Sequence, residues 1–276
     1  MANNHSRVLL DERPQVARPR ALRVSLAAGT AGERLVSIAT PVLVLVFWEA
    51  AARAHLIDAR ILPPPSVVLA TIVQLLQEGI LLTDTRDTIV RFLVGMLVGV
   101  VPGVLIGVTM GLFRWVRAGL NPLVAAFYNV PRLALFPLVL ILIGLNEVSN
   151  TLMIALGPFF TMLLTSMGAV MNVDPVYRDV APNFNTPARH LYTLVMLPAI
   201  GPALIDGLRI SVGLGLLGTI TVEFLVGETG LGRLIWNSWQ VLSLTQSMAG
   251  LVVAAIVGYL FYSSVAWLER LLIPWR

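Results

Sequence analysis

The stretch VEFLVGETGLGRLIW, residues 222–236, decides the fold of this chain, because it closes a long apolar run with features that generic membrane sequence rarely combines. Glu223 lies near the end of that run, and a tight Gly-Leu-Gly turn at residues 230–232 follows it. The run opens with MLPAIGPALIDGLRIS, residues 196–211. A carboxylate inside an apolar segment is costly and marks either an anchor or a functional group.

Composition places the chain in a membrane. Apolar residues make up 57% of its 276 residues, charged residues make up 12%, and the mean hydropathy is +0.84. A soluble domain of this length could not bury so much apolar surface. Because a spanning helix needs about 20 mostly apolar residues, we expect an all-α integral membrane protein with about six spans, at residues 35–54, 88–113, 121–145, 151–171, 200–226 and 246–268.

Arginine sets the expected orientation, since it supplies all 19 basic residues of the chain. With the N-terminus inside, twelve arginines fall on the cytoplasmic side and five on the other, where six acidic residues offset them. This asymmetry follows the positive-inside rule and predicts that both termini are cytoplasmic. The net charge of +4 is therefore a topology signal and does not indicate nucleic-acid binding.

The ends and the polar residues limit the possible functions. Residues 1–33 are predicted to be a flexible, Arg-rich cytoplasmic tail that only sets topology or also contacts anionic lipid headgroups. Residues 34–276 then form the transmembrane domain. The chain has no cysteine, its three histidines lack ligand spacing, and it has no Gly-rich nucleotide-binding loop. We expect no metal or other cofactor in this chain.

A repeat in the second expected span indicates close helix packing. Its glycines are each four residues apart, so they share one helical face: Gly95, Gly99, Gly103, Gly107 and Gly111. Such a stripe lets another backbone approach closely, and we predict a packing role for it, with sliding during transport as a further option.

The loop at residues 174–198, between the fourth and fifth expected spans, resembles the ATPase-coupling loop of permease subunits of ATP-binding cassette importers. In that family the loop reads E-A-A, three residues, Gly, nine residues, then I-x-L-P. The spacing here matches without a gap. The corresponding residues are Asp179, Val180, Ala181, Asn185, Val195, Leu197 and Pro198. Asn in the place of Gly preserves a turn at positive φ, because Asn is the commonest substitute there.

The resemblance extends over nearly the whole chain from about residue 48, in the order and spacing of short motifs. They are Trp48-Glu49, LPPPS at 62–66, Arg91, YNVPRLALFPLVLILIGL at 128–145, GLRI at 207–210 and VEFL at 222–225. Together they are similar to the nitrate, sulfonate and taurine branch of type I importers.

That resemblance implies a six-helix permease of the bacterial cytoplasmic membrane that is not itself an enzyme. It implies that the chain pairs with a second permease subunit. We expect this subunit to be another copy of the same chain and not a related permease. It further implies two ATPase subunits that bind ATP and Mg²⁺ and an extracytoplasmic binding protein that delivers a small, mostly anionic solute such as a sulfonate, taurine or nitrate.

Intramembrane polar groups are the physical guide to the solute pathway. Arg132 follows Pro131 about a dozen residues into the third expected span. One hypothesis places Arg132 and Asn129 on the central pathway, where Arg132 attracts an anionic solute. The alternative, which the sequence alone favours, is that residues 119–130 run along the cytoplasmic interface and Arg132 reaches water. Glu223 is a third pathway candidate, and it can instead fix the following turn by accepting backbone hydrogen bonds.

A secondary transporter and a membrane enzyme are the two alternatives to the importer. A secondary transporter driven by an ion gradient usually shows two equivalent halves with paired broken helices, and no such repeat is visible. A membrane enzyme needs a clustered set of acid, base, nucleophile or metal ligands, and this chain carries only isolated carboxylates. The importer is favoured over both alternatives by two segments that resemble its family, residues 174–198 and 222–236.

Overall fold

The computed structural model describes residues 31–173 and 196–273, and these residues form helices and turns without a β-strand. Five of the helices contain segments long and apolar enough to cross a membrane. They are α1 (Ala31–Arg53), α3 (Ile80–Leu112), α6 (Glu147–Met171), α9 (Leu197–Val226) and α11 (Leu244–Leu272). The expected all-α class with several spans is therefore confirmed.

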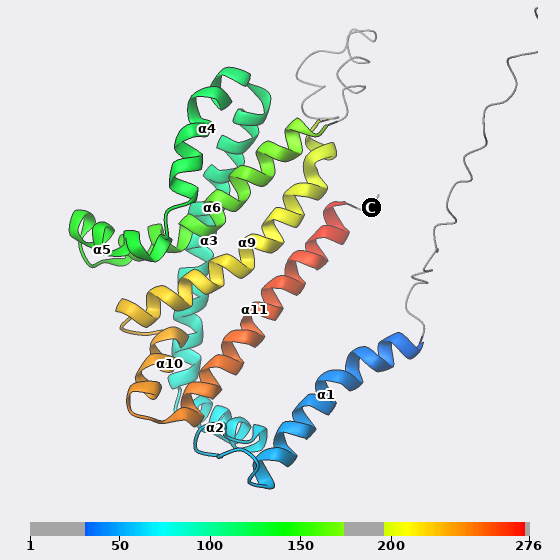
Figure 1. Ribbon diagram of the computed structural model, residues 1–276, viewed down its shortest axis with the longest axis vertical. Coiled ribbons are helices and arrows are strands. Elements are labelled where there is room, and N and C mark those ends of the chain that lie inside the picture. Colours follow the sequence, from blue (N-terminus) through cyan, green and yellow to red (C-terminus); the bar gives the residue numbers. More distant parts are fainter. Residues whose placement is uncertain (1–30, 174–195, 274–276) are drawn as a thin grey trace, which may run out of the picture. The chain divides into compact units, whose positions relative to one another are not determined.

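The third expected span is broken into two helices. α4 (Arg114–Tyr128) and α5 (Arg132–Ile143) meet at an angle of 99°, and Figure 1 shows α5 leaving the end of α4 sharply. Pro131 lies directly before α5 and cannot continue α4, because it lacks the backbone N–H and its ring fixes φ. The pair counts as a sixth span only if both helices together cross the membrane.

The chain divides into two units, with residues 31–47 of α1 in one and Trp48–Arg276 in the other. The first unit presents large apolar side chains to its surroundings, and Leu35 is 70% exposed and Phe47 72% exposed. Such a surface suits contact with lipid. The proposed tail at residues 1–33 lies almost wholly outside the described residues and stays a prediction.

Within the second unit, Glu49 ties the end of α1 to α2 (Pro65–Gln77). The backbone N–H and the hydroxyl of Ser66 both donate to the Glu49 carboxylate, at 3.0 and 2.8 Å. Arg53 donates to the same carboxylate at 2.6 Å. The helix begins at Pro65 without a side-chain cap of its own, and Glu49 accepts the free N–H of Ser66 in the first turn.

The glycine stripe of α3 lies against α6. A Cβ added to Gly103 would stand 2.6 Å from the carbonyl oxygen of Phe159, and every other glycine of the stripe likewise has α6 atoms within contact distance. The two backbones therefore touch along four turns. In lipid, where no hydrophobic effect drives helices together, such close packing is the main source of association.

The bundle is completed by α9, which packs on α3 and α6, and by α10 (Leu231–Gln240) and α11. Apolar side chains of α2, α3, α10 and α11 form one buried cluster that includes Leu75, Leu81 and Leu231. α9 and α11 are also joined by an ion pair of 2.6 Å between Arg209 and Glu269, and the Arg209 guanidinium lies 5.3 Å from the centre of the Tyr262 ring. Helical spacing suggests Asp206 as the partner of Arg209, and the structure shows a hydrogen bond from Arg209 to Glu269.

Adding one methyl group to the glycine stripe is expected to destabilise the protein. In Gly103→Ala the new Cβ meets backbone and cannot be relieved by a side-chain rotation, so we expect a loss of about 2 kcal/mol and a thermal midpoint several degrees lower in detergent. Tryptophan fluorescence recorded during a temperature ramp measures this thermal midpoint.

Gly119→Ala in α4 is the matched control, because a Cβ there meets no atom within 4 Å. Helix propensity alone favours Ala over Gly by about 1 kcal/mol, so this variant should be as stable as the parent or more so. Equal midpoints for the two variants would contradict close packing of α3 on α6.

Candidate transport site of the membrane domain

Glu223, at the end of α9, is buried and holds the turn that follows it. Its side chain is 1% exposed. One carboxylate oxygen accepts the backbone N–H of Gly232 at 3.0 Å, and the Thr88 hydroxyl lies within 3.0 Å of both oxygens. A buried carboxylate is tolerated only when it is paired and hydrogen-bonded, and here each oxygen has a partner.

The polar partners come from α3, where Asp84, Thr88 and Arg91 share one face. Asp84 accepts the backbone N–H of Gly230 at 2.8 Å, and the Thr88 hydroxyl accepts that of Leu231 at 2.8 Å. Arg91 donates to the carbonyl oxygen of Thr229 at 2.7 Å and to Glu223 at 3.2 Å. We call these three residues, with Glu147 and Glu223, the turn network.

Glu147, at the start of α6, brings a third helix into the turn network. Its carboxylate lies 3.2 Å from Arg91 Nη2 and is 65% exposed, whereas the Arg91 side chain is 16% exposed. Arg91 therefore bridges a buried carboxylate of α9 and an exposed one of α6. The network fixes the relative positions of the ends of three spans.

Gly230 is required by the same geometry. Its φ is +113°, a region that L residues rarely adopt, and a Cβ at this position would clash with the Glu223 carboxyl group. The Gly-Leu-Gly turn is therefore built around the carboxylate. Of the two roles considered for Glu223, the geometry supports the anchor of this turn, and its place on a solute pathway stays a prediction.

The sequence did not single out Asp84 or Thr88, because the second span was expected to begin only at residue 88. α3 begins at Ile80, eight residues earlier. Residues 84, 88 and 91 are four and then three apart, so this spacing could have predicted that their side chains share one face of a helix. The spacing could not have predicted the partner of this face, because the turn at residues 229–232 lies about 140 residues further along the chain.

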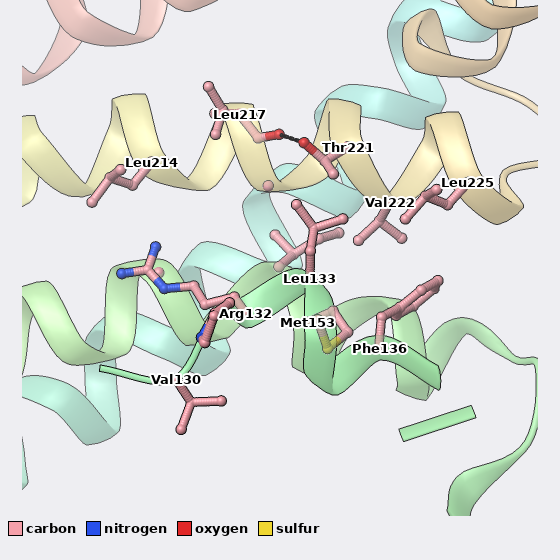
Figure 2. Close-up of a pocket in the computed structure, with 14 residues that line it drawn as sticks. Val130, Arg132, Leu133, Phe136, Met153, Leu214, Leu217, Thr221, Val222 and Leu225 are labelled. Atoms are coloured by element: carbon pink, nitrogen blue, oxygen red, sulfur yellow. Dashed lines mark hydrogen bonds between the residues drawn. The ribbon is translucent and has the colours of Figure 1, made fainter. Parts of the chain in front are cut away.

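A separate cavity of about 430 Å³ lies between α5, α6 and α9, as Figure 2 shows. Its lining includes Arg132 at the start of α5, Phe136, Met153, Leu214 and Leu225. Phe136 is 4% exposed and packs with Met153, Ile154 and Val222, which holds α5 against α6 and α9. Apart from Arg132 and Thr221, the side chains of this lining are apolar or absent.

The Arg132 guanidinium lies beside the middle of two spans. Gly157 of α6 is so close that a Cβ added there would stand 3.2 Å from Arg132 Nη1 and 3.5 Å from Leu214 Cβ. Gly157 is ten residues, or about 15 Å at 1.5 Å per residue, from the start of α6. The guanidinium thus lies away from the ends of both helices, and the role of Arg132 on a pathway stays a prediction.

Asn129 does not accompany Arg132 in this conformation. It ends α4, and its side-chain amide donates to the carbonyl oxygen of Ala125 at 2.7 Å, so it satisfies the broken end of the helix. Its side chain is exposed. The cavity lining therefore contains one of the three residues predicted for the pathway, Arg132.

The predicted coupling residues Asp179, Val180, Ala181, Asn185 and Val195 lie outside the described residues. Leu197 and Pro198 begin α9, and Leu197 is 56% exposed. Near them, a second cavity of about 580 Å³ lies between the end of α6 and the start of α9 and includes Asn172 and Ala199. Among the described residues, no group of three or more metal-ligating side chains comes together.

Several helices long and apolar enough to cross a membrane, a bent helix pair and a cavity lined by one charged side chain are features found in membrane transport proteins. The chain belongs to the family of inner membrane components of binding-protein-dependent transport systems, whose pattern matches residues 99–276. It is therefore a permease subunit of an ATP-binding cassette importer of type I, and it is not itself an enzyme. Membership implies an ATPase and a solute-binding partner, and the secondary-transporter alternative gains no support.

Similarity to named permeases places the chain in the sulfonate and taurine branch. It is 30% identical over 236 residues to the putative aliphatic sulfonates transport permease protein SsuC of Bacillus subtilis, covering 86% of each chain. It is 29% identical to the taurine transport system permease protein TauC of Escherichia coli, covering 87% of this chain and 90% of TauC.

A solved structure supports the fold alone. One chain of the MetNI methionine ABC transporter, in an inward facing conformation, matches with a TM-score of 0.51 and 20% identity. The match covers 67% of this chain and 90% of that one.

Neutralising Glu223 is expected to loosen the turn at residues 229–232. In Glu223→Gln an amide NH₂ group replaces one carboxylate oxygen, which accepts a hydrogen bond either from Gly232 N–H or from Arg91. Two donors then face each other in a buried site, which should destabilise the turn by about 3 kcal/mol. Hydrogen exchange followed by mass spectrometry should show faster exchange of peptides that contain residues 229–232.

Glu228→Gln is the control, because Glu228 is exposed and lies in the same turn. Its exchange should match that of the parent. If Glu223→Gln also leaves exchange unchanged, the carboxylate does not hold the turn.

Proposed function

We propose that this permease imports a small organic anion of the sulfonate type, delivered by an extracytoplasmic binding protein and driven by ATP hydrolysis on two separate ATPase subunits. ATP and Mg²⁺ bind to those subunits and not to this chain. The observation that carries the proposal is Arg132, whose guanidinium has no acidic partner among the described residues and lines a cavity midway along two spans.

Two of the relatives, SsuC and TauC, support the choice of solute. Their names assign aliphatic sulfonates and taurine to them, and both solutes carry a sulfonate group that is ionised at neutral pH. A guanidinium presents donors that match the oxygens of such a group. Arg132 would then attract the anion within the membrane, and Asn129 and Glu223 remain pathway candidates for conformations other than the present one.

A second copy of the chain is the proposed partner within the membrane. The break between α4 and α5 leaves residues 129–131 outside both helices, and Asn129 and Pro131 are exposed. Irregular backbone at membrane depth is tolerated only where protein or a wet cavity covers it. α5 packs mainly on α6, and its Ile141 is 81% exposed. A symmetric dimer would cover this region and enclose the pathway between the two copies.

Coupling to ATP hydrolysis is assigned to residues 174–198. The ends of α6 and α9 that flank this segment are joined by a buried cluster of Val170, Val173, Met196 and Ile200. A force applied to the segment would therefore reach both helices at once, and these are two of the three helices that line the Arg132 cavity.

Purification through a tag on this chain tests the assembly. We expect an ATPase subunit and a binding protein to be recovered with it from native membranes, and ³⁵S-labelled sulfonate uptake into cells to stop when ATP is depleted.

Ala181→Glu should reduce recovery of the ATPase by at least about tenfold, because a charge in a packed interface is left unpaired. Membrane insertion should be unchanged.

The matched control is Ala59→Glu, which adds the same charge at an exposed position between α1 and α2, outside the predicted coupling loop. It should leave ATPase recovery intact. Uptake that survives ATP depletion but stops when the proton or sodium gradient is dissipated would overturn the proposal in favour of a secondary transporter.

Labelling of single cysteines tests the orientation. Because the chain has no cysteine, each introduced thiol reports one position. His5→Cys and Arg276→Cys should react with a membrane-impermeant maleimide only after permeabilisation of spheroplasts, since the arginine distribution puts both termini inside. Arg60→Cys, between α1 and α2, should react in intact spheroplasts. The reverse pattern would contradict the proposed topology.

A further inference from the structure

The last third of α11 carries an open groove on the face that turns away from the bundle. Val257 and Val265 of α11 pack into buried clusters with side chains of α2, α3, α9 and α10. Helical periodicity puts the groove on the opposite face. It has a volume of about 260 Å³ and is lined by Tyr259, Tyr262, Ser263, Ala266, Trp267 and Arg270.

The groove runs from the end of the span toward its middle. α11 has 29 residues and is therefore about 43 Å long, whereas the hydrocarbon core is about 30 Å thick. A helix centred in the membrane would place Arg270, two residues before the end of α11, at the headgroups. Tyr259 lies about 17 Å further in at 1.5 Å per residue, among the acyl chains. A ligand of this groove is charged at one end and apolar along its length.

The charge of Arg270 is uncommitted within the described part of the chain. Its neighbour Glu269 is held by Arg209 of α9 at 2.6 Å, and no hydrogen bond or ion pair joins Arg270 to a described residue. Ser263 likewise has no hydrogen-bond partner there, whereas the hydroxyl of the adjacent Ser264 donates to Leu260 at 2.7 Å. The groove therefore offers a cation and a hydroxyl to a ligand.

Aromatic side chains line the groove next to Arg270. Trp267, Tyr262 and Tyr259 are exposed, and tryptophan and tyrosine are the side chains that membrane proteins place at the boundary between headgroups and acyl chains. The Tyr262 ring also lies 5.3 Å from the Arg209 guanidinium. Tyr262 thus connects the groove to the ion pair that joins α9 to α11.

We propose that this groove binds one anionic phospholipid, with its phosphate on Arg270 and an acyl chain along Ala266 and Tyr259. A free phosphate shares the headgroup chemistry but would leave the apolar length of the groove uncovered, so the ligand is a lipid. The site is distinct from solute transport. Its leaflet follows from the proposed topology, in which the end of α11 is cytoplasmic, and that leaflet carries the negative surface potential.

The bound lipid would act where coupling to ATP hydrolysis is assigned. The end of α11 lies beside the start of α9, because a Cβ added to Gly201 would stand 3.8 Å from Ile273 Cδ1, and both ends lie on the same side of the domain in Figure 1. α9 directly follows the predicted coupling loop. A lipid held by Arg270 and Tyr262 would therefore strengthen the junction of α9 and α11 at this end.

Native mass spectrometry measures the binding directly. The protein is purified through a tag on this chain with the subunits that accompany it, stripped of lipid in detergent, and titrated with dioleoylphosphatidylglycerol or dioleoylphosphatidylcholine. Bound lipids are counted at each concentration. We expect the first binding step to favour phosphatidylglycerol by at least about fivefold, since one arginine near an anionic headgroup contributes about that factor.

Two variants locate the site. Arg270→Gln should remove the preference for phosphatidylglycerol and leave the affinity for phosphatidylcholine unchanged. Ala266→Trp should weaken the binding of both lipids by at least about fivefold while the charge stays in place, because the added ring fills the groove and displaces the acyl chain. Elution of each variant at the volume of the parent in size exclusion reports that it has folded.

Arg60→Gln is the matched control. It removes an exposed arginine between α1 and α2, and α2 packs on the start of α11, at the other end of this helix from Arg270. Its preference for phosphatidylglycerol should equal that of the parent. A loss of preference in this control as large as in Arg270→Gln would mean that net charge alone attracts the lipid, and the site would be overturned.

Three other results would overturn the site. The first is a parent without a preference for phosphatidylglycerol, or an Arg270→Gln variant that keeps it. The second is displacement of phosphatidylglycerol by equimolar glycerol 3-phosphate, which would assign Arg270 to a free phosphate. The third is unchanged lipid binding in Ala266→Trp, which would place the lipid on another surface. Sulfonate uptake enters none of these measurements, so the proposed function stands or falls separately.

Discussion

The close contact between α3 and α6 is the constraint on which the rest of the membrane domain depends. Glycines every fourth residue let the two backbones touch over four turns, and this contact fixes where α6 stands. The other faces of α6 then receive α9 and α5, and between these three helices lies the cavity that contains Arg132. A shift of α6 would alter the space at Gly157 and with it the position of the guanidinium.

The turn network secures the same arrangement at one end. Glu223 of α9, Arg91 of α3 and Glu147 of α6 join three spans through charged hydrogen bonds, and the backbone of residues 229–232 is wrapped around the Glu223 carboxylate. Its two carboxylates differ in environment, since Glu223 is 1% exposed and Glu147 is 65% exposed. The buried link is the stronger one, because low dielectric strengthens a fully hydrogen-bonded pair. At this network, α6 is thus tied to the others more loosely than α3 and α9 are tied to each other.

The arginines of the domain differ in whether they pair with an acidic side chain. Arg91 and Arg209 have acidic partners on other helices and hold those helices together. Arg132 lies in a lining without an acidic residue. Sequence alone could count these residues but could not sort them, because the sorting depends on which helix each one meets.

The sequence by itself determined the membrane class, the approximate places of five spans, the glycine stripe and the family, because each of these depends on local composition, on helical periodicity or on motifs with fixed spacing. Proline alone does not locate the break, because Pro131 precedes α5 whereas Pro102 and Pro158 lie inside α3 and α6. Only the tertiary structure decided that the third span bends by 99°. Only the tertiary structure showed that Thr88 and Asp84 hold a turn about 140 residues away, that Glu49 satisfies the start of α2, and that Gly157 makes room for Arg132. These contacts join residues far apart in the chain, and their existence depends on how whole helices pack, which no local pattern records.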